Sequence, residues 1–176
     1  PILRAALAVT LAAALGGCAA LTDLIEPSCD AQNAAARGKP RTVYTLESEQ
    51  GVAPRGVLAQ APVYKLRFRK SYAHPCGTLI VLKEATILRG AGDHIVFTEV
   101  RDFFAEDGTL IASVTDDQSA SITKSGVYTS RTEIPIPQNA PPGKYRISTR
   151  LLTAKRGGPA VMRGQTSSYF FIVPRD

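Results

Sequence analysis

The regular alternation of apolar and polar side chains is the feature that most constrains the fold of this chain. In the segment Tyr64–Arg69 every second residue is apolar and the residues between are basic. A period of two places the two kinds of side chain on opposite faces of an extended strand. The continuous apolar run Thr78–Leu82 predicts a central strand buried on both faces, although a short helix would give the same pattern.

Turn signals separate further apolar runs along the chain. Asp107-Gly108 stands between two of these runs and predicts a β-hairpin, because such a turn needs a positive φ. Seven to nine strands with regularly spaced turns, and no long amphipathic helix, predict an all-β antiparallel sandwich over residues 41–176. Besides the two segments above, the expected strands are Ile95–Phe104, Thr109–Val114, Tyr128–Ile136, Tyr145–Leu151 and Ser167–Val173.

A proline-rich crossover gives the C-terminal third its most specific pattern. The segment Gly126–Pro137 leads through Ala140-Pro141-Pro142-Gly143 into Lys144-Tyr145. This segment resembles the bacterial immunoglobulin-like and macroglobulin-type sandwiches. The resemblance implies an immunoglobulin-like fold and a hydrogen bond from Tyr145 back across the corner. It implies no particular activity, and the thioester sequence Cys-Gly-Glu-Gln is absent from the chain.

The N-terminal segment has the order of features found in export signals. Arg4 precedes the apolar stretch Ala5–Ala14, which is too short to span a bilayer as a helix. The following Leu15-Gly16-Gly17-Cys18 resembles the bacterial lipobox. That resemblance implies that residues 1–17 are a cleaved leader and that Cys18 carries the lipid. An ordinary secretory leader is the alternative and would release the protein from the membrane.

Lipidation of Cys18 also implies where the protein resides. Ala19 and Ala20 follow the cysteine, and neither resembles the aspartate that retains such proteins in the inner membrane of enteric bacteria. We therefore expect attachment to the outer membrane, facing the periplasm. Residues 18–40 are rich in alanine and polar residues and are interrupted by prolines, which predicts a flexible tether.

The chain has three cysteines, and acylation of the first would leave an even pair. Cys29 and Cys76 are then predicted to form a disulfide, as the oxidising compartment of an exported protein allows. The alternative is two unrelated reduced thiols.

The formal net charge of +6 favours anionic partners, but the basic residues are scattered rather than massed. Without a recognised motif, this bias does not indicate nucleic-acid binding. The most suggestive surface is the basic row Lys65, Arg67, Arg69 and Lys70, which could meet an anionic glycan, a lipid phosphate or an acidic protein. A solvated face that discourages edge aggregation is the alternative reading.

The residue types that carry chemistry do not assemble into a recognisable site. His74 and Cys76 offer a metal only two ligands, and no Gly-x-Ser-x-Gly motif is present. His94 beside Asp93 is interpreted as part of a solvated loop. The carboxylates lack the spacing of a calcium loop and are interpreted as exposed turn residues; they are Asp102, Glu106, Asp107, Asp116 and Asp117. The sequence thus predicts no enzyme, no cofactor and no metal site.

These observations favour a non-enzymatic structural or accessory lipoprotein, docked by its edge or its basic face onto an envelope protein. The alternative is a module that binds a small ligand or an anionic glycan, which would require an apolar concavity. A long open edge without a deep pocket would favour docking. A deep cavity near His74 or His94 would favour the alternative.

Overall fold

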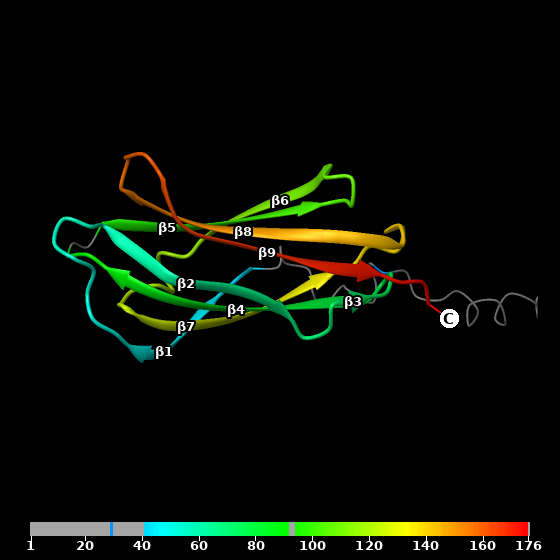
Figure 1. Ribbon diagram of the computed structural model, residues 1–176, viewed down its shortest axis with the longest axis horizontal. Coiled ribbons are helices and arrows are strands. Elements are labelled where there is room, and N and C mark those ends of the chain that lie inside the picture. Colours follow the sequence, from blue (N-terminus) through cyan, green and yellow to red (C-terminus); the bar gives the residue numbers. More distant parts are fainter. Residues whose placement is uncertain (1–28, 30–40, 92–93, 176) are drawn as a thin grey trace, which may run out of the picture.

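The computed structural model describes residues 29, 41–91 and 94–175, and it folds them into two packed β-sheets (Figure 1). The four-stranded sheet has the order β1-β7-β4-β2 and the five-stranded sheet the order β3-β9-β8-β5-β6. This confirms the predicted all-β sandwich. The strands are β1 (Tyr44–Glu49), β2 (Ala59–Phe68), β3 (Tyr72–Ala73), β4 (Thr78–Arg89), β5 (Ile95–Phe104), β6 (Leu110–Asp117), β7 (Gly126–Pro135), β8 (Gly143–Lys155) and β9 (Val161–Ile172).

Strands that neighbour one another are antiparallel, with one exception. The short strand β3 runs parallel to β9, pairing Tyr72 with Phe171 and Ala73 with Ile172. β2 and β3 are consecutive in the chain but belong to different sheets, so the chain changes layers in the short segment 69–71. The sandwich is therefore antiparallel apart from this edge pairing, which the alternation of side chains alone could not predict.

Several local predictions hold in detail. Residues 105–109 connect β5 to β6, and Gly108 there has a φ of 87°. The hydroxyl of Tyr145 donates a hydrogen bond to the carbonyl of Pro141 over 2.6 Å, which closes the predicted corner. The predicted strand at Thr78–Leu82 is the first part of the longer β4, but it is not buried on both faces. Its outer residues Ile80 and Leu82 are only half-buried, because none of the described strands forms a second layer over that side of the four-stranded sheet.

The space between the sheets contains two apolar clusters. One gathers large side chains such as Phe97, Tyr128 and Leu151, and the other includes Leu79, Ile147 and Phe170. On β4, Val81 belongs to the second cluster and Ala85 to the first, and the inward residue between them is Lys83. A polar layer therefore separates the two halves of the core.

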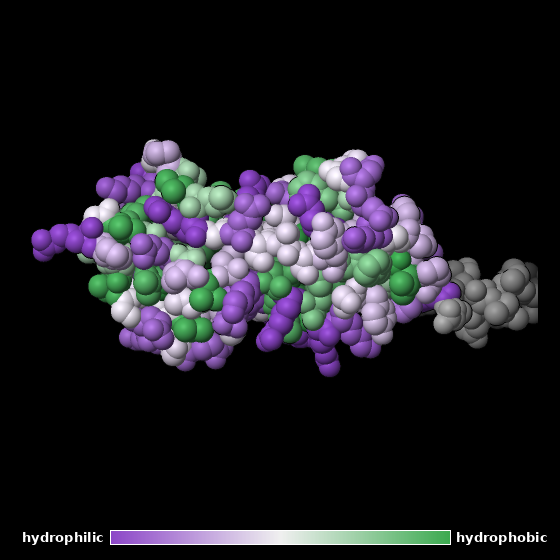
Figure 2. Space-filling view, in the orientation of Figure 1, coloured by the Kyte–Doolittle hydropathy of each residue, from purple (hydrophilic) through white to green (hydrophobic). Residues whose placement is uncertain are grey.

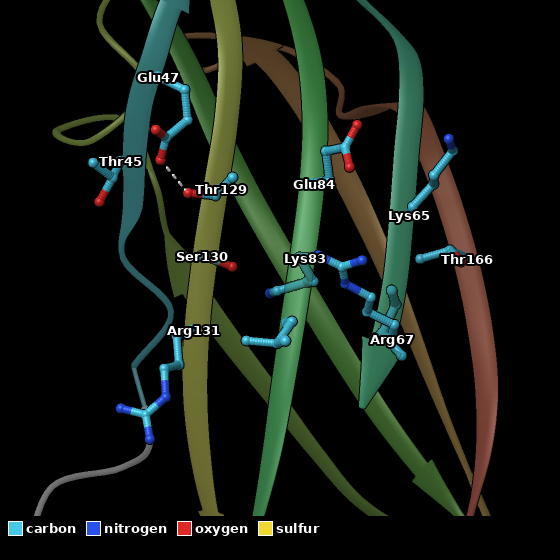
Figure 3. Close-up of a pocket in the computed structure, with 12 residues that line it drawn as sticks. Thr45, Glu47, Lys65, Arg67, Lys83, Glu84, Thr129, Ser130, Arg131 and Thr166 are labelled. Carbon is cyan, nitrogen blue, oxygen red and sulfur yellow. Dashed lines mark hydrogen bonds between the residues drawn. The ribbon is translucent and has the colours of Figure 1, made fainter. Parts of the chain in front are cut away.

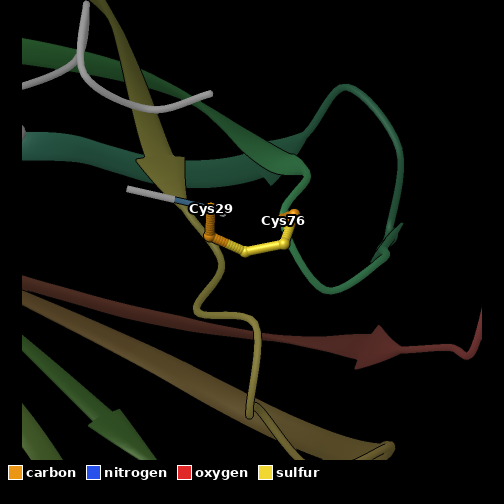
Figure 4. Close-up of a disulfide and its surroundings, with 2 residues drawn as sticks. All are labelled: Cys29 and Cys76. Atoms are coloured by element: carbon orange, nitrogen blue, oxygen red, sulfur yellow. A yellow bond between two sulfur atoms is a disulfide. The ribbon is translucent and has the colours of Figure 1, made fainter. Parts of the chain in front are cut away.

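The predicted disulfide is present and joins Cys29 to Cys76 across 47 residues, with their Cα atoms 4.8 Å apart (Figure 4). The remaining N-terminal predictions, which are the leader 1–17, the lipid site Cys18 and the rest of the tether 18–40, lie outside the described residues. Among the residues that are described, no helix is long and apolar enough to cross a membrane.

Candidate functional site

Most of the predicted basic row lies on the outer face of the four-stranded sheet. Lys65 and Arg67 are exposed on β2, where they pair in register with Glu84 and Leu82 of β4. Arg69 follows directly and its backbone N–H bonds the carbonyl of Ile80. Lys70 leaves this row, because the chain turns toward β3, and its ammonium lies 5.6 Å from the centre of the Tyr72 ring.

A shallow hollow of about 610 Å³ lies on this outer face (Figure 3). Arg67 and Arg131 lie in register on either side of Leu82, one on β2 and one on β7. Carboxylates share the hollow with these cations, because Glu47 and Glu84 also line it. The hollow is therefore polar and of mixed charge, rather than the deep apolar concavity of a typical small-molecule site.

A group of ionised side chains fills the polar layer between the sheets. Lys83 of β4 forms an ion pair with Glu99 of β5, and both side chains are completely enclosed. Glu99 also accepts hydrogen bonds from the hydroxyls of Tyr44 (2.6 Å) and Tyr64 (3.0 Å). Arg101 pairs with Asp116 of β6 at 2.5 Å, and its Nε lies 3.6 Å from Glu99. Together these six residues form the buried ion cluster.

The environment of the cluster shifts the ionisation of its members. Burial lowers the pKa of Lys83 to about 8, although the carboxylate of Glu99 acts in the opposite direction. Burial alone would raise the pKa of Glu99, but the Lys83 ammonium and the hydrogen bonds to the carboxylate hold it below its ordinary value. Burial also raises the pKa values of Tyr44 and Tyr64.

The buried ion cluster is inaccessible to a substrate, so we assign it a structural role. Its signal in the sequence is the presence of charged residues at inward positions of alternating strands, as with Lys83 between Val81 and Ala85. Lys83, Glu99 and Arg101 were not predicted from the sequence to interact. The prediction that Asp102 and Asp116 are exposed turn residues was wrong, because both are buried. Each forms an ion pair with an arginine of its own sheet: Asp102 with Arg150, and Asp116 with Arg101.

The other candidate residues do not come together. His74 Nδ1 lies 2.8 Å from the carbonyl of Pro174, while His94 is exposed in the segment between β4 and β5, where the chain passes from one sheet to the other. Asp107 and Asp117 each accept a backbone N–H from two residues ahead, as turn residues do. Asp93 lies outside the described residues. No three potential metal ligands gather anywhere in the part of the chain that the structure describes.

The most open structural element is the edge strand β6. It ends the five-stranded sheet, and within the described residues it pairs only with β5. Six of its eight residues are exposed, and Leu110 and Ile111 each expose 55% of their surface. Figure 1 shows β6 at the edge of its sheet, next to β5. An edge of this kind presents unpaired backbone N–H and C=O groups to the surroundings.

Comparisons with known proteins give structural neighbours but no relative in sequence. No family model and no curated protein matches the chain. The C-terminal domain of wzt is similar with a TM-score of 0.46 and 9% identity over 82% of this chain and 86% of that domain. A family 123 glycoside hydrolase from Clostridium perfringens is similar with a TM-score of 0.38 and 13% identity, covering 64% of this chain and 27% of the hydrolase.

Spo0M, a sporulation control protein from Bacillus subtilis, also has a TM-score of 0.38 and 13% identity, over 68% of this chain and 50% of Spo0M. These likenesses are too distant to transfer an activity, a ligand or a partner to this chain.

Proposed function

We propose that this protein is a non-enzymatic, lipid-anchored accessory protein of the bacterial envelope. In this proposal its sandwich docks onto a partner protein by pairing the open edge of β6 with an extended segment of that partner. The observation that carries the proposal is the edge itself: eight residues long, mostly exposed, and paired on one side only within the described chain. Strand addition to such an edge obtains affinity from main-chain hydrogen bonds and specificity from alternate side chains.

The contrast between the sandwich's two long edge strands supports this choice. β2 carries Pro62 inside an irregular segment, between Gln60 and Val63, where its pairing with β4 shifts register. A proline and a bulge blunt an edge against further pairing. β6 contains neither proline nor a basic residue; its pairing with β5 shifts register once, at Ile111, and is regular from Ala112 to Asp117. The proline thus blunts one long edge, and the regular part of the other is left available within the described chain.

The lipid anchor is the second component of the proposal. A diacylated Cys18 would hold the protein on the outer membrane, facing the periplasm. Confinement to a surface raises the local concentration of the sandwich near other envelope proteins, so a modest docking affinity suffices.

Proline substitutions on β6 test the docking mode. Neighbouring residues of an edge strand direct their N–H groups alternately toward the paired strand and toward the open side. Of Val114→Pro and Thr115→Pro, one should therefore keep the β5–β6 pairing and block the open edge. Each acylated variant is purified from detergent-solubilised envelopes after light cross-linking, and its partners are identified by mass spectrometry beside a Cys18→Ala control.

We expect the wild type to retain a partner at a fixed stoichiometry, and the proline variant that keeps its melting temperature to lose it. Unchanged recovery of the partner with that folded variant would rule out docking through β6. Recovery of the partner with Cys18→Ala at the wild-type level would show that the anchor is not needed.

A second candidate function uses the hollow on the other sheet. Arg67 and Arg131 flank Leu82 in register there; Arg131 is paired with Glu133, and a basic residue on each side of Leu82 suits the carboxylates of an acidic oligosaccharide. Titration calorimetry with oligogalacturonate checks this alternative. Binding that weakens at least about tenfold, or roughly 1.4 kcal/mol, in an Arg67→Gln/Arg131→Gln variant would support it. No measurable heat with the wild type would eliminate it.

A further inference from the structure

A second surface, on the outer face of the five-stranded sheet, combines exposed aromatic rings with basic side chains. Its residues stand in two rows across neighbouring strands. In one row, Arg146 of β8 lies between Phe104 of β5 and Tyr169 of β9. In the other, Phe171 of β9 lies between Lys144 of β8 and Tyr72 of β3. We call these six residues the aromatic–basic patch.

The rings of the patch point away from the core. Tyr169 and Phe171 alternate along β9 with the buried Phe170 and Ile172, which places them on the outer face of the sheet. Tyr169 exposes 54% of its surface, and Phe171 and Tyr72 expose 45% each. Exposed aromatic residues gathered at one place on a protein mark a contact surface more often than scattered ones do. Figure 2 shows hydrophobic residues among hydrophilic ones on the surface at both ends of the molecule.

Cations accompany the rings of the patch closely. The ammonium of Lys144 lies 4.4 Å from the centre of the Tyr169 ring, and the guanidinium carbon of Arg146 lies 4.2 Å from that of Phe104. Lys70, which was predicted as part of the basic row, lies in the segment where the chain passes from one sheet to the other, and its ammonium lies over the ring of Tyr72. Phenylalanine and tyrosine rings beside basic side chains match the boundary between lipid headgroups and acyl chains, where rings enter the apolar layer and cations meet phosphates.

The border of the patch also carries negative charge. A hollow of about 370 Å³ lies between Lys144, Arg146 and Tyr169 on one side and Glu106 and Asp107 on the other. The basic groups suit a phosphate, and the two carboxylates suit an amine. Headgroups that contain both, such as phosphoethanolamine, fit this border better than purely anionic ones.

The disulfide places the patch near the proposed anchor. Tyr72 is four residues from Cys76, and Cys76 is bonded to Cys29. The eleven residues from Cys18 to Cys29 can span at most about 40 Å. The disulfide-bonded end of the sandwich, shown at Cys76 in Figure 4, therefore stays within about 40 Å of the lipid, which keeps the patch within reach of the membrane.

We propose that the aromatic–basic patch lies against the phosphate-bearing headgroup layer of the membrane that anchors the chain. This inference rests on the lipid anchor of the proposed function, but not on the docking edge. Contact through the patch would fix how the sandwich is oriented above the membrane, whereas a lipid on a tether fixes only its distance.

Tryptophan fluorescence tests the contact directly, because the natural sequence contains no tryptophan. Tyr169→Trp and Phe171→Trp each place a single reporter in the patch, and Thr129→Trp places one on the exposed outer face of the opposite sheet. The mature acylated chain is reconstituted into vesicles with brominated acyl chains, made of phosphatidylethanolamine with or without phosphatidylglycerol. Flotation of the vesicles independently measures anchoring.

We expect tryptophan at 169 and at 171 to shift its emission to shorter wavelength and to lose most of it to bromine quenching, while tryptophan at 129 does neither. The same result without phosphatidylglycerol would identify the zwitterionic headgroup as sufficient, and a requirement for phosphatidylglycerol would assign the contact to anionic headgroups. Chain that floats with the vesicles while its patch tryptophans stay unquenched would overturn the membrane contact and leave the anchor intact. Chain that does not float would overturn both.

Discussion

Breaking one ion pair of the buried cluster should cost far more stability than the same change on the surface. Lys83→Met removes the ammonium from the enclosed Lys83–Glu99 pair and leaves the carboxylate buried. The hydroxyls of Tyr44 and Tyr64 still donate to that carboxylate and Arg101 Nε stays 3.6 Å away, but Arg101 is already paired with Asp116, so the cluster is left with two carboxylates and one cation. Removal of one member of a buried pair typically costs about 3–5 kcal/mol.

That loss is large beside the roughly 5–15 kcal/mol that stabilises an ordinary domain. At about 3 °C per kcal/mol for a domain of this size, the melting temperature should fall by roughly 10 °C or more. Lys65→Met is the matched control, because Lys65 is exposed on β2, and we expect its effect to stay within about 0.5 kcal/mol. Urea titration at pH 7, followed by circular dichroism, measures the free energy of unfolding of each variant.

The double variant Lys83→Met/Glu99→Gln tests the cause of the loss. It removes both charges, while glutamine can still accept the tyrosine hydrogen bonds, so we expect it to regain about 2 kcal/mol relative to Lys83→Met. A Lys83→Met variant as stable as Lys65→Met would refute the claim that the pair is sealed in the core. A double variant less stable than Lys83→Met would show that the loss comes from packing rather than from an unbalanced charge.

Two further predictions concern pH and close packing. The Lys83 ammonium and the hydrogen bonds to Glu99 hold the pKa of that carboxyl below its ordinary value, so the unfolded chain binds more protons than the folded chain as the pH falls through the carboxyl range, and the free energy of unfolding should fall there by an amount that Lys83→Met reduces. Above pH 10 it should fall as well, because burial raises the pKa of Tyr44 and Tyr64 in the folded state; urea titrations across both ranges check these slopes, and a fall at low pH that Lys83→Met leaves unchanged would contradict the pairing. Gly164→Ala should destabilise the fold by about 1–3 kcal/mol, since a Cβ there would lie 2.8 Å from the Cβ of Tyr64. Gly157→Asn, in an exposed turn with a φ of 77°, is the control, and thermal melts measure both variants. Equal melting temperatures would disprove the tight packing at Gly164.

Local chemistry made much of this fold predictable from the sequence. The Asp107-Gly108 hairpin and the Tyr145 corner depend on residues within a few positions of one another, so their signals are complete in the sequence. The alternation along β7 and β8 likewise follows from burying one face of a strand.

The interior of the sandwich and its edges were not predictable in this way. The pairing of Lys83 with Glu99 requires strands from opposite sheets to meet at one level, and no local pattern states which residues will face each other. The same is true of Lys70, whose place beside Tyr72 depends on where the chain changes sheets, and of β6, whose open edge depends on the order of strands in its sheet.

The proposed docking of β6 is tested most directly by photo-cross-linking from defined positions in living cells. A photoreactive phenylalanine analogue replaces Ile111 on β6, and in a separate control it replaces Thr129 on the outer face of the four-stranded sheet; both residues are exposed. We expect a discrete adduct with one envelope protein from position 111 and none from position 129, and the cross-linked peptide of the partner should map to an extended segment. An adduct only from position 129, with position 111 unreacted, would contradict docking through β6 and move the partner to the opposite sheet.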